Sequence, residues 1–123
     1  MFVCHGNICR STMAEFVMKD LVRKAGLADK FIINSSATSR EEIGCDYDMY
    51  DYIIVMDNNN LRNLSYIIGE DTEHKVYKMM SFVGENRDVK DPWYTDNFDE
   101  TYADVDKACR ALLAKLIKEY NLA

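Results

Sequence analysis

A cysteine and an arginine lie close together near the start of the sequence, in the stretch FVCHGNICRST at residues 2–12. The thiolate of a cysteine is a strong nucleophile, and the planar guanidinium of an arginine can hold two oxygens of a phosphoryl group. Five residues separate Cys4 from Arg10, which is enough backbone to curl around one tetrahedral anion. The pair therefore predicts phosphoryl transfer, in which Cys4 forms a cysteinyl-phosphate and Arg10 binds the phosphoryl oxygens.

The residues between Cys4 and Arg10 favour a backbone cradle for such an anion. Gly6 adopts a positive φ without strain, and Asn7 tolerates the left-handed region better than most residues. A loop that leads into a helix N-terminus directs several backbone N–H groups and the positive end of the helix dipole at one point. Ser11 is placed to donate to the Cys4 sulfur, either stabilising the thiolate or helping it leave. The predicted phosphate-binding residues are Cys4, His5, Gly6, Asn7, Ile8, Cys9 and Arg10.

The segments on either side of this loop have the patterns of a buried strand and of a helix. Residues 1–4 are apolar, and residues 11–26 carry apolar side chains at helical spacing. Thr12 and Glu15 have the spacing of a capping box, and Gly26 is a typical residue at a helix end. The loop is therefore expected at the carboxyl end of a strand, where α/β sheets bind ligands.

The rest of the chain alternates between strand-like and helix-like segments. Further strands are expected at residues 30–36, 50–57 and 75–82. Helices are expected at residues 58–69, where asparagines can cap the start, and along the apolar stripe from Tyr102 to Tyr120. Such alternation predicts a single α/β domain over residues 1–123, with three layers: a four-stranded parallel sheet and helices on both faces.

Composition and charge exclude several classes of protein. A chain of 123 residues with 48% hydrophobic residues suits one globular domain, and its apolar runs are too short to span a membrane. The net charge of −6 argues against binding to nucleic acid or to an acidic membrane surface. No export signal opens the sequence, so a cytoplasmic location is expected, with the four cysteines reduced.

Four separate motifs of the chain resemble those of the low-molecular-weight protein tyrosine phosphatases. The stretch VCHGNICRS resembles the signature loop of that family. In the same order follow SSATSREEIG at residues 35–44, YDYIIVMDNNNL at 50–61 and VKDPWY at 89–94, each similar to a family segment. The resemblance covers most of the chain and implies hydrolysis of protein phosphotyrosine or of small aryl phosphates, without a cofactor.

The resemblance also implies roles for residues outside the loop. Asp91, which precedes Pro92, matches the aspartate that protonates the leaving phenolate and then activates water. Asn7, Ser11 and Ser35 match positions that support the loop by hydrogen bonds. Cys9 matches a second cysteine that forms a reversible disulfide with the nucleophile under oxidation. The expected substrate pocket is lined by His5, Ile8, Glu41, Trp93 and Tyr94.

No metal site is expected, because Cys4, His5 and Cys9 lack a second pair of ligands at metal-binding spacing and His74 is far away in sequence. His5 replaces a residue that is usually aliphatic in the family, and Glu41 one that is often aromatic. We therefore expect His5 to influence substrate choice rather than to catalyse.

The sequence departs from the family after Gly44, where a crossover helix is expected but CDYDMYDYII follows directly. Either the chain is truly shortened there, or residues are missing from the sequence as given. A bond between Gly44 and Cys45 would place their Cα atoms about 3.8 Å apart. A real deletion would be expected to expose apolar surface, to lower stability or to favour pairing with a second copy. The protein is therefore expected to be a monomer or a weak dimer.

Three other functions compete with phosphotyrosine hydrolysis. A phosphoarginine phosphatase of the same fold would usually carry Thr at the position of Ile8. An arsenate reductase would need two further cysteines close together, and Cys45 and Cys109 do not fit. A phosphate-binding or redox-sensing module with little turnover is the alternative from another class.

Overall fold

Four short parallel strands form the central sheet of the protein. The computed structural model describes residues 1–4, 10–37, 49–90, 95 and 97–122. Within the described residues the strand order is β2-β1-β3-β4, and all three pairings are parallel. The strands are β1 (Phe2–Cys4), β2 (Ser35–Ala37), β3 (Ile53–Val55) and β4 (Val76–Lys78). The predicted four-stranded parallel sheet is thereby confirmed.

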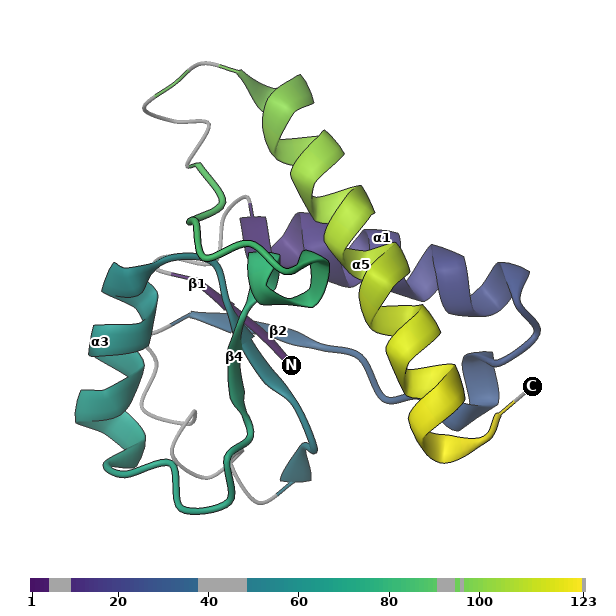
Figure 1. The fold of residues 1–123 in the computed structure, drawn as a ribbon, viewed down its shortest axis with the longest axis horizontal. Helices are drawn as coiled ribbons and strands as arrows, with labels where there is room; N and C mark the ends of the chain where they lie inside the picture. The colour runs from purple at the N-terminus through teal and green to yellow at the C-terminus, as the bar shows by residue number, and fades with distance from the viewer. Residues whose placement is uncertain (5–9, 38–48, 91–94, 96, 123) are drawn as a thin grey trace.

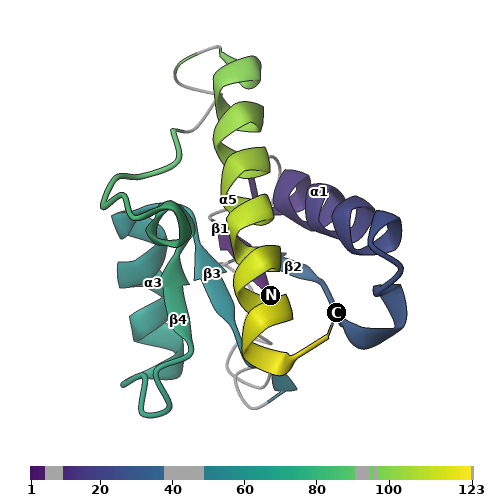
Figure 2. The same cartoon turned by 45° about the vertical axis from the view of Figure 1, so that its right-hand side comes forward.

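In the part of the chain that the structure describes, three long helices cover the two faces of this sheet, which confirms the predicted three-layer arrangement. Helices α1 (Arg10–Lys24) and α5 (Phe98–Tyr120) lie on one face, and α3 (Asn58–Ile68) lies on the other (Figures 1 and 2). The helices begin where the sequence provides caps: Asp57 accepts from the backbone N–H of Asn60, and Asn97 accepts from that of Glu100.

Alternating side chains of the strands divide the core between the two faces. Phe2, Cys4 and Ile54 pack with the buried stripes of α1 and α5. Val3, Ile53 and Val55 point the other way and pack with Leu64 of α3. The central strands are therefore buried on both sides, as continuous apolar runs such as YIIVM predict.

The second predicted strand, at residues 30–36, is wrong in its position. Ala28–Lys30 form a 3-10 helix, and the strand itself runs only from Ser35 to Ala37. The register explains this shift, because Phe2 pairs with Ser35 and Cys4 with Ala37. Residues upstream of Asn34 have no ladder partner in β1, so their β-branched composition alone does not make them a strand.

The fourth predicted strand, at residues 75–82, is too long. β4 ends at Lys78, and Met79–Val83 form a 3-10 helix that ends at Gly84 with φ 76°. Met79 and Met80 are both fully buried. Neighbouring residues of a strand point to opposite faces, so the chain turns here to bury both methionines in the same cluster.

The predicted capping box at Thr12 and Glu15 is also wrong, because α1 begins at Arg10 and Thr12 lies inside the helix. Gly26 follows the helix end with φ 73°, as expected. The crossover after Gly44 falls on residues 38–48, which lie outside the described residues, as does the Gly44–Cys45 distance. Along the described stretches, no helix has the length and apolar character needed to cross a membrane.

Candidate active site

The two ends of the predicted cradle lie at the carboxyl edge of the sheet. Cys4 is the last residue of β1, the second strand in the sheet order, and Arg10 is the first residue of α1. The prediction of a strand that leads into a helix through this loop is confirmed. His5, Gly6, Asn7, Ile8 and Cys9, which carry the cradle's predicted backbone donors, lie outside the described residues.

Cys4 and Ser11 are in direct contact. The Cys4 Sγ lies 3.1 Å from the Ser11 Oγ, and both residues are buried. Either atom can be the donor of this hydrogen bond: the thiol to the hydroxyl, or the hydroxyl to a thiolate. The geometry is therefore suited to the role predicted for Ser11, since a hydroxyl at this distance stabilises negative charge on sulfur.

Arg10 is buried and held by two acceptors from distant parts of the chain. Its Nη1 donates to the Asp57 Oδ2 at 2.8 Å and to the Val89 backbone carbonyl at 2.7 Å. The Arg10 side chain is 5% exposed and that of Asp57 is 16% exposed. These bonds fix one edge of the guanidinium, so the group is set in one orientation before any ligand arrives.

Asp57 is a site residue that the sequence reasoning missed. It lies two residues after the end of β3 and also caps α3, so one carboxylate positions both Arg10 and a helix. A signal was present, because residues 1–4 and 50–57 were both expected as buried strands of one parallel sheet. Residues just after parallel strands gather at the same edge of the sheet, and this rule points from Cys4 to Asp57.

Ser35, predicted to support the loop, makes a different contact in the described part of the chain. Its hydroxyl donates to the Glu15 carboxylate of α1 at 2.6 Å. Burial acts to raise the pKa of Glu15, but hydrogen bonds from Lys19 and Ser35 outweigh it and keep that pKa below its ordinary value. The pair therefore links β2 to α1 one turn after Ser11, and support of Asn7 by Ser35 remains a prediction.

The segment before Asp91 is attached to the same edge. The Val89 N–H donates to the Met56 carbonyl at 2.9 Å, directly after β3. The Thr101 hydroxyl of α5 donates to the Lys90 carbonyl at 2.9 Å. Asp91, Trp93 and Tyr94, like the pocket residue Glu41, lie outside the described residues, so their predicted roles stay predictions.

Cys109 is unsuited to nucleophilic chemistry. It is fully buried between α5 and α1, and its thiol donates to the Ala14 carbonyl at 3.8 Å. Burial, together with the negative charge of Asp106, raises the pKa of this thiol well above its ordinary value. Of the two cysteines that the structure describes, only Cys4 lies at the ligand-binding edge of the sheet.

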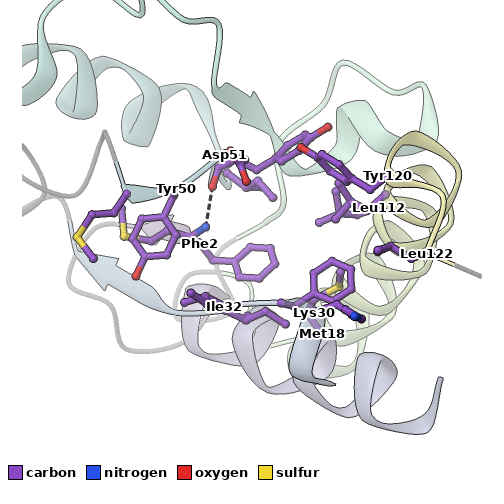
Figure 3. A pocket seen from close by; sticks show the side chains of 16 residues that line it. Phe2, Met18, Lys30, Ile32, Tyr50, Asp51, Leu112, Tyr120 and Leu122 are labelled. Carbon is purple, nitrogen blue, oxygen red and sulfur yellow. Dashed lines mark hydrogen bonds between the residues drawn. The ribbon is translucent and has the colours of Figure 1, made fainter. Parts of the chain in front are cut away.

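A cavity of about 360 Å³ lies at the opposite end of the sheet and is distinct from this site. Figure 3 shows Phe2, Leu112 and Tyr120 among its lining side chains, with Tyr50 and Asp51 at one side. Phe2 is the first residue of β1, Met1 precedes it and Tyr52 precedes β3, so the cavity opens at the amino ends of these strands. The chemistry of Cys4 and Arg10 belongs to the other end.

Comparison with known proteins identifies a common pattern over nearly the whole chain. The family described as low molecular weight phosphotyrosine protein phosphatase matches residues 1–46 and 36–122. The low molecular weight protein-tyrosine-phosphatase YfkJ of Bacillus subtilis is 32% identical over 99% of this chain and 97% of its own. The two matched stretches of the family overlap at residues 36–46, and the alignment with YfkJ spans 152 positions against 123 residues here. The alignment with YfkJ is therefore longer than this chain, and the family match divides at residues 36–46, which include Gly44, where the sequence departs from the family.

Solved structures agree with this similarity. The crystal structure of YfkJ superposes with a TM-score of 0.86, covering 96% of this chain and 93% of that one. SP-PTP, a low molecular weight protein tyrosine phosphatase from Streptococcus pyogenes, is 37% identical with a TM-score of 0.79, covering 97% and 93%. The arginine phosphatase YwlE has a TM-score of 0.83, covering 99% and 97%, but at 21% identity it shows the fold alone.

Proposed function

Because the chain belongs to the low molecular weight protein-tyrosine-phosphatase family, we propose that it hydrolyses phosphotyrosine in proteins, and small aryl phosphates, through a cysteinyl-phosphate. The observation that carries the proposal is the cluster at the carboxyl edge of the sheet. There the Cys4 sulfur lies 3.1 Å from the Ser11 hydroxyl, and a buried Arg10 begins the helix that follows. A nucleophile and a phosphoryl-binding cation are thus held by adjoining elements.

In the first step of the proposed reaction, the Cys4 thiolate attacks phosphorus and forms the S–P bond. The bond between phosphorus and the aryl oxygen breaks, and the leaving oxygen takes a proton from Asp91. Arg10 and the backbone N–H groups of residues 4–10 balance the negative charge on the transferred phosphoryl oxygens. Arg10 is suited to this because Asp57 and Val89 already fix one edge of its guanidinium.

In the second step, Asp91 takes a proton from a water molecule, whose oxygen attacks the phosphorus of the cysteinyl-phosphate. The S–P bond breaks, inorganic phosphate leaves, and the thiolate returns. The Ser11 hydroxyl supports this step, because it lies within hydrogen-bond distance of the sulfur that must carry the charge. A phosphoryl-binding loop and a cysteine nucleophile perform both steps without a cofactor.

The remaining assignments extend this proposal to specificity and regulation. His5, Ile8, Glu41, Trp93 and Tyr94 would line a pocket for an aryl phosphate. Cys9 would form a disulfide with Cys4 under oxidation and so protect the nucleophile from irreversible oxidation. We further propose a cytoplasmic location and a monomer or weak dimer. Phosphoarginine is the alternative substrate on this fold, but Ile8 favours phosphotyrosine.

Hydrolysis of p-nitrophenyl phosphate in the presence of EDTA tests the proposal. We expect turnover by the protein, none by Cys4→Ser, and a strongly reduced rate for Asp91→Ala. Cys109→Ala is the matched control, since it removes a thiol that lies away from the site. Binding of inorganic phosphate without turnover by the unchanged protein would contradict the proposal and favour a binding module.

A further inference from the structure

We propose that Thr101 is a positioning residue for the reaction, because its hydroxyl fixes the peptide group that leads into Asp91. This inference rests on the proposed role of Asp91 as the acid that protonates the leaving group. Thr101 lies in the first turn of α5 and is 0% exposed. It carries no proposed contact with the substrate, and it acts through the backbone of a neighbouring segment.

The hydroxyl of Thr101 selects an acceptor outside its own helix. A threonine within a helix usually donates to the carbonyl four residues earlier. Here that acceptor, the Asn97 carbonyl, lies 3.4 Å from Oγ1, while the Lys90 carbonyl lies at 2.9 Å. A hydroxyl has one proton to donate, and the shorter distance assigns it to Lys90. The buried Thr101 hydroxyl therefore stabilises the segment that contains Lys90 and not the first turn of its own helix.

A hydrogen bond to the Lys90 carbonyl affects the orientation of the peptide group between Lys90 and Asp91. The peptide bond is planar, so the carbonyl oxygen of Lys90 lies in the same rigid plane as the nitrogen and Cα of Asp91. A hydrogen bond to that oxygen orients the whole plane and sets the point from which the Asp91 side chain departs. A small error at this point matters, because a misplacement of about 1 Å can cost about 100-fold in rate.

The residues just before Lys90 are already attached on the other side. The Val89 N–H donates to Met56 at the end of β3, and the Val89 carbonyl accepts from Arg10. Within the part of the chain that the structure describes, the bond from Thr101 is the last backbone attachment ahead of Asp91. It follows that Val89 is held by the phosphate-binding side of the site, and that Lys90 is held by α5.

A second contact joins the same segment to α5. The Arg87 guanidinium donates both Nη1 and Nη2 to the Asp104 carboxylate, each at 2.8 Å. Asp104 lies three residues after Thr101, so both attachments reach the first turns of the same helix. The pair with Arg87 is partly exposed to solvent, and its expected contribution is smaller than that of the buried Thr101 bond.

The test compares Thr101→Val, which removes the donor at nearly constant shape, with Thr101→Ser, which retains it. The measured quantity is kcat/KM for phenyl phosphate and for p-nitrophenyl phosphate. Phenolate is the poorer leaving group and depends more on protonation. For Thr101→Val we expect kcat/KM for phenyl phosphate to fall about 10-fold more than for p-nitrophenyl phosphate. Thr101→Ser should restore most of the difference, and inhibition by inorganic phosphate should be unchanged.

Three outcomes decide between the inference and its alternatives. An equal fall for both substrates in Thr101→Val would overturn it, because a merely structural role does not distinguish leaving groups. Asp91→Ala serves as the reference. If Asp91→Ala leaves the ratio of kcat/KM for the two substrates unchanged, Asp91 is not the acid and the proposed role of Asp91 is wrong. If Asp91→Ala changes this ratio but Thr101→Val does not, only the positioning role of Thr101 is overturned. Should Thr101→Val fail to fold, Arg87→Met tests the attachment of the same segment to α5: a larger fall in kcat/KM for phenyl phosphate than for p-nitrophenyl phosphate supports the inference, and an unchanged ratio of the two overturns it.

Discussion

Replacing Asp57 with asparagine tests the central ion pair of the site. The carboxylate has two tasks: Oδ2 accepts from Arg10, and Oδ1 accepts from the backbone N–H of Asn60 at the start of α3. Asparagine keeps a side-chain oxygen and is as good a helix cap as aspartate, but it has no negative charge. Asp57→Asn therefore removes the counter-charge of Arg10 while leaving the cap in place.

The size of the effect follows from the burial of the pair. Removing one partner of a fully buried ion pair costs about 3–5 kcal/mol. Asp57 retains 16% exposure, and asparagine still offers one acceptor, so we expect a loss below this range, about 2 kcal/mol. For a chain of this size such a loss lowers the Tm by about 8 °C. Asp57→Ala also loses the cap and should cost about 1 kcal/mol more.

Urea and thermal unfolding of the three proteins measure these differences directly. Asp20→Asn is the matched control, because it makes the same chemical change in a carboxylate paired with Arg23 and Lys24 at the surface. Its unfolding should match that of the unchanged protein within experimental error. An Asp57→Asn variant as stable as the control would refute the reasoning, because the buried pair would then contribute no net stability.

Three further predictions address the chemistry and pH dependence of the site. Ser11→Ala should lower kcat for p-nitrophenyl phosphate about 10- to 100-fold, the worth of a hydrogen bond to charged sulfur, and unchanged steady-state rates would argue against that role of Ser11. Burial acts to raise the pKa of Glu15, but the hydrogen bonds from Lys19 and Ser35 together outweigh it and hold the pKa below its ordinary value of 4.5. The stability that this lowered pKa contributes is present above pH 4.5 and is lost as the pH falls through the lowered pKa. In Glu15→Gln the free energy of unfolding should therefore fall less steeply with acidification than in the unchanged protein. An equally steep fall would contradict this. Peroxide inactivation of Cys9→Ser should become irreversible by thiols, while recovery equal to that of the unchanged protein would exclude Cys9 as the redox partner.

Local patterns were sufficient to predict the fold and the two ends of the cradle. The apolar stripe of the last helix and the helical spacing within residues 58–69 are signals within a few turns of the chain, although the residue that caps α3 is Asp57 and not one of the predicted asparagines. Cys4 at a strand end and Arg10 at a helix start follow from a short apolar run and a helical period that adjoin in sequence. Such signals depend on neighbours a few residues apart, so no knowledge of tertiary packing is needed.

Contacts that join distant segments could not be predicted in the same way. The Arg10–Asp57 bond spans 47 residues and the Arg10–Val89 bond spans 79. Both depend on β1 and β3 pairing with Val3 opposite Val55, because a different register would move Asp57 away from Arg10. The bond from Thr101 to Lys90 depends in turn on where α5 packs. The predicted bounds of β2 and β4 were wrong for a related reason. Pairing with β1 decides where β2 lies, and burial of Met79 and Met80 decides where β4 stops.

The long-range contacts of the site come from parts of the chain outside the stretch where the family pattern divides. The two stretches that match the family model overlap at residues 36–46, which begin within β2 and end before β3. The bonds that hold Cys4, Arg10 and the segment before Asp91 come from α1, the end of β3, Val89 and α5, none of which belongs to that stretch. β3 keeps its place beside β1 through their own ladder, so Asp57 still reaches Arg10 whatever the length of the connection. None of these described contacts depends on residues 42–48, so substitutions there, which also spare the proposed pocket residue Glu41, should change kcat/KM for p-nitrophenyl phosphate less than they change the free energy of unfolding.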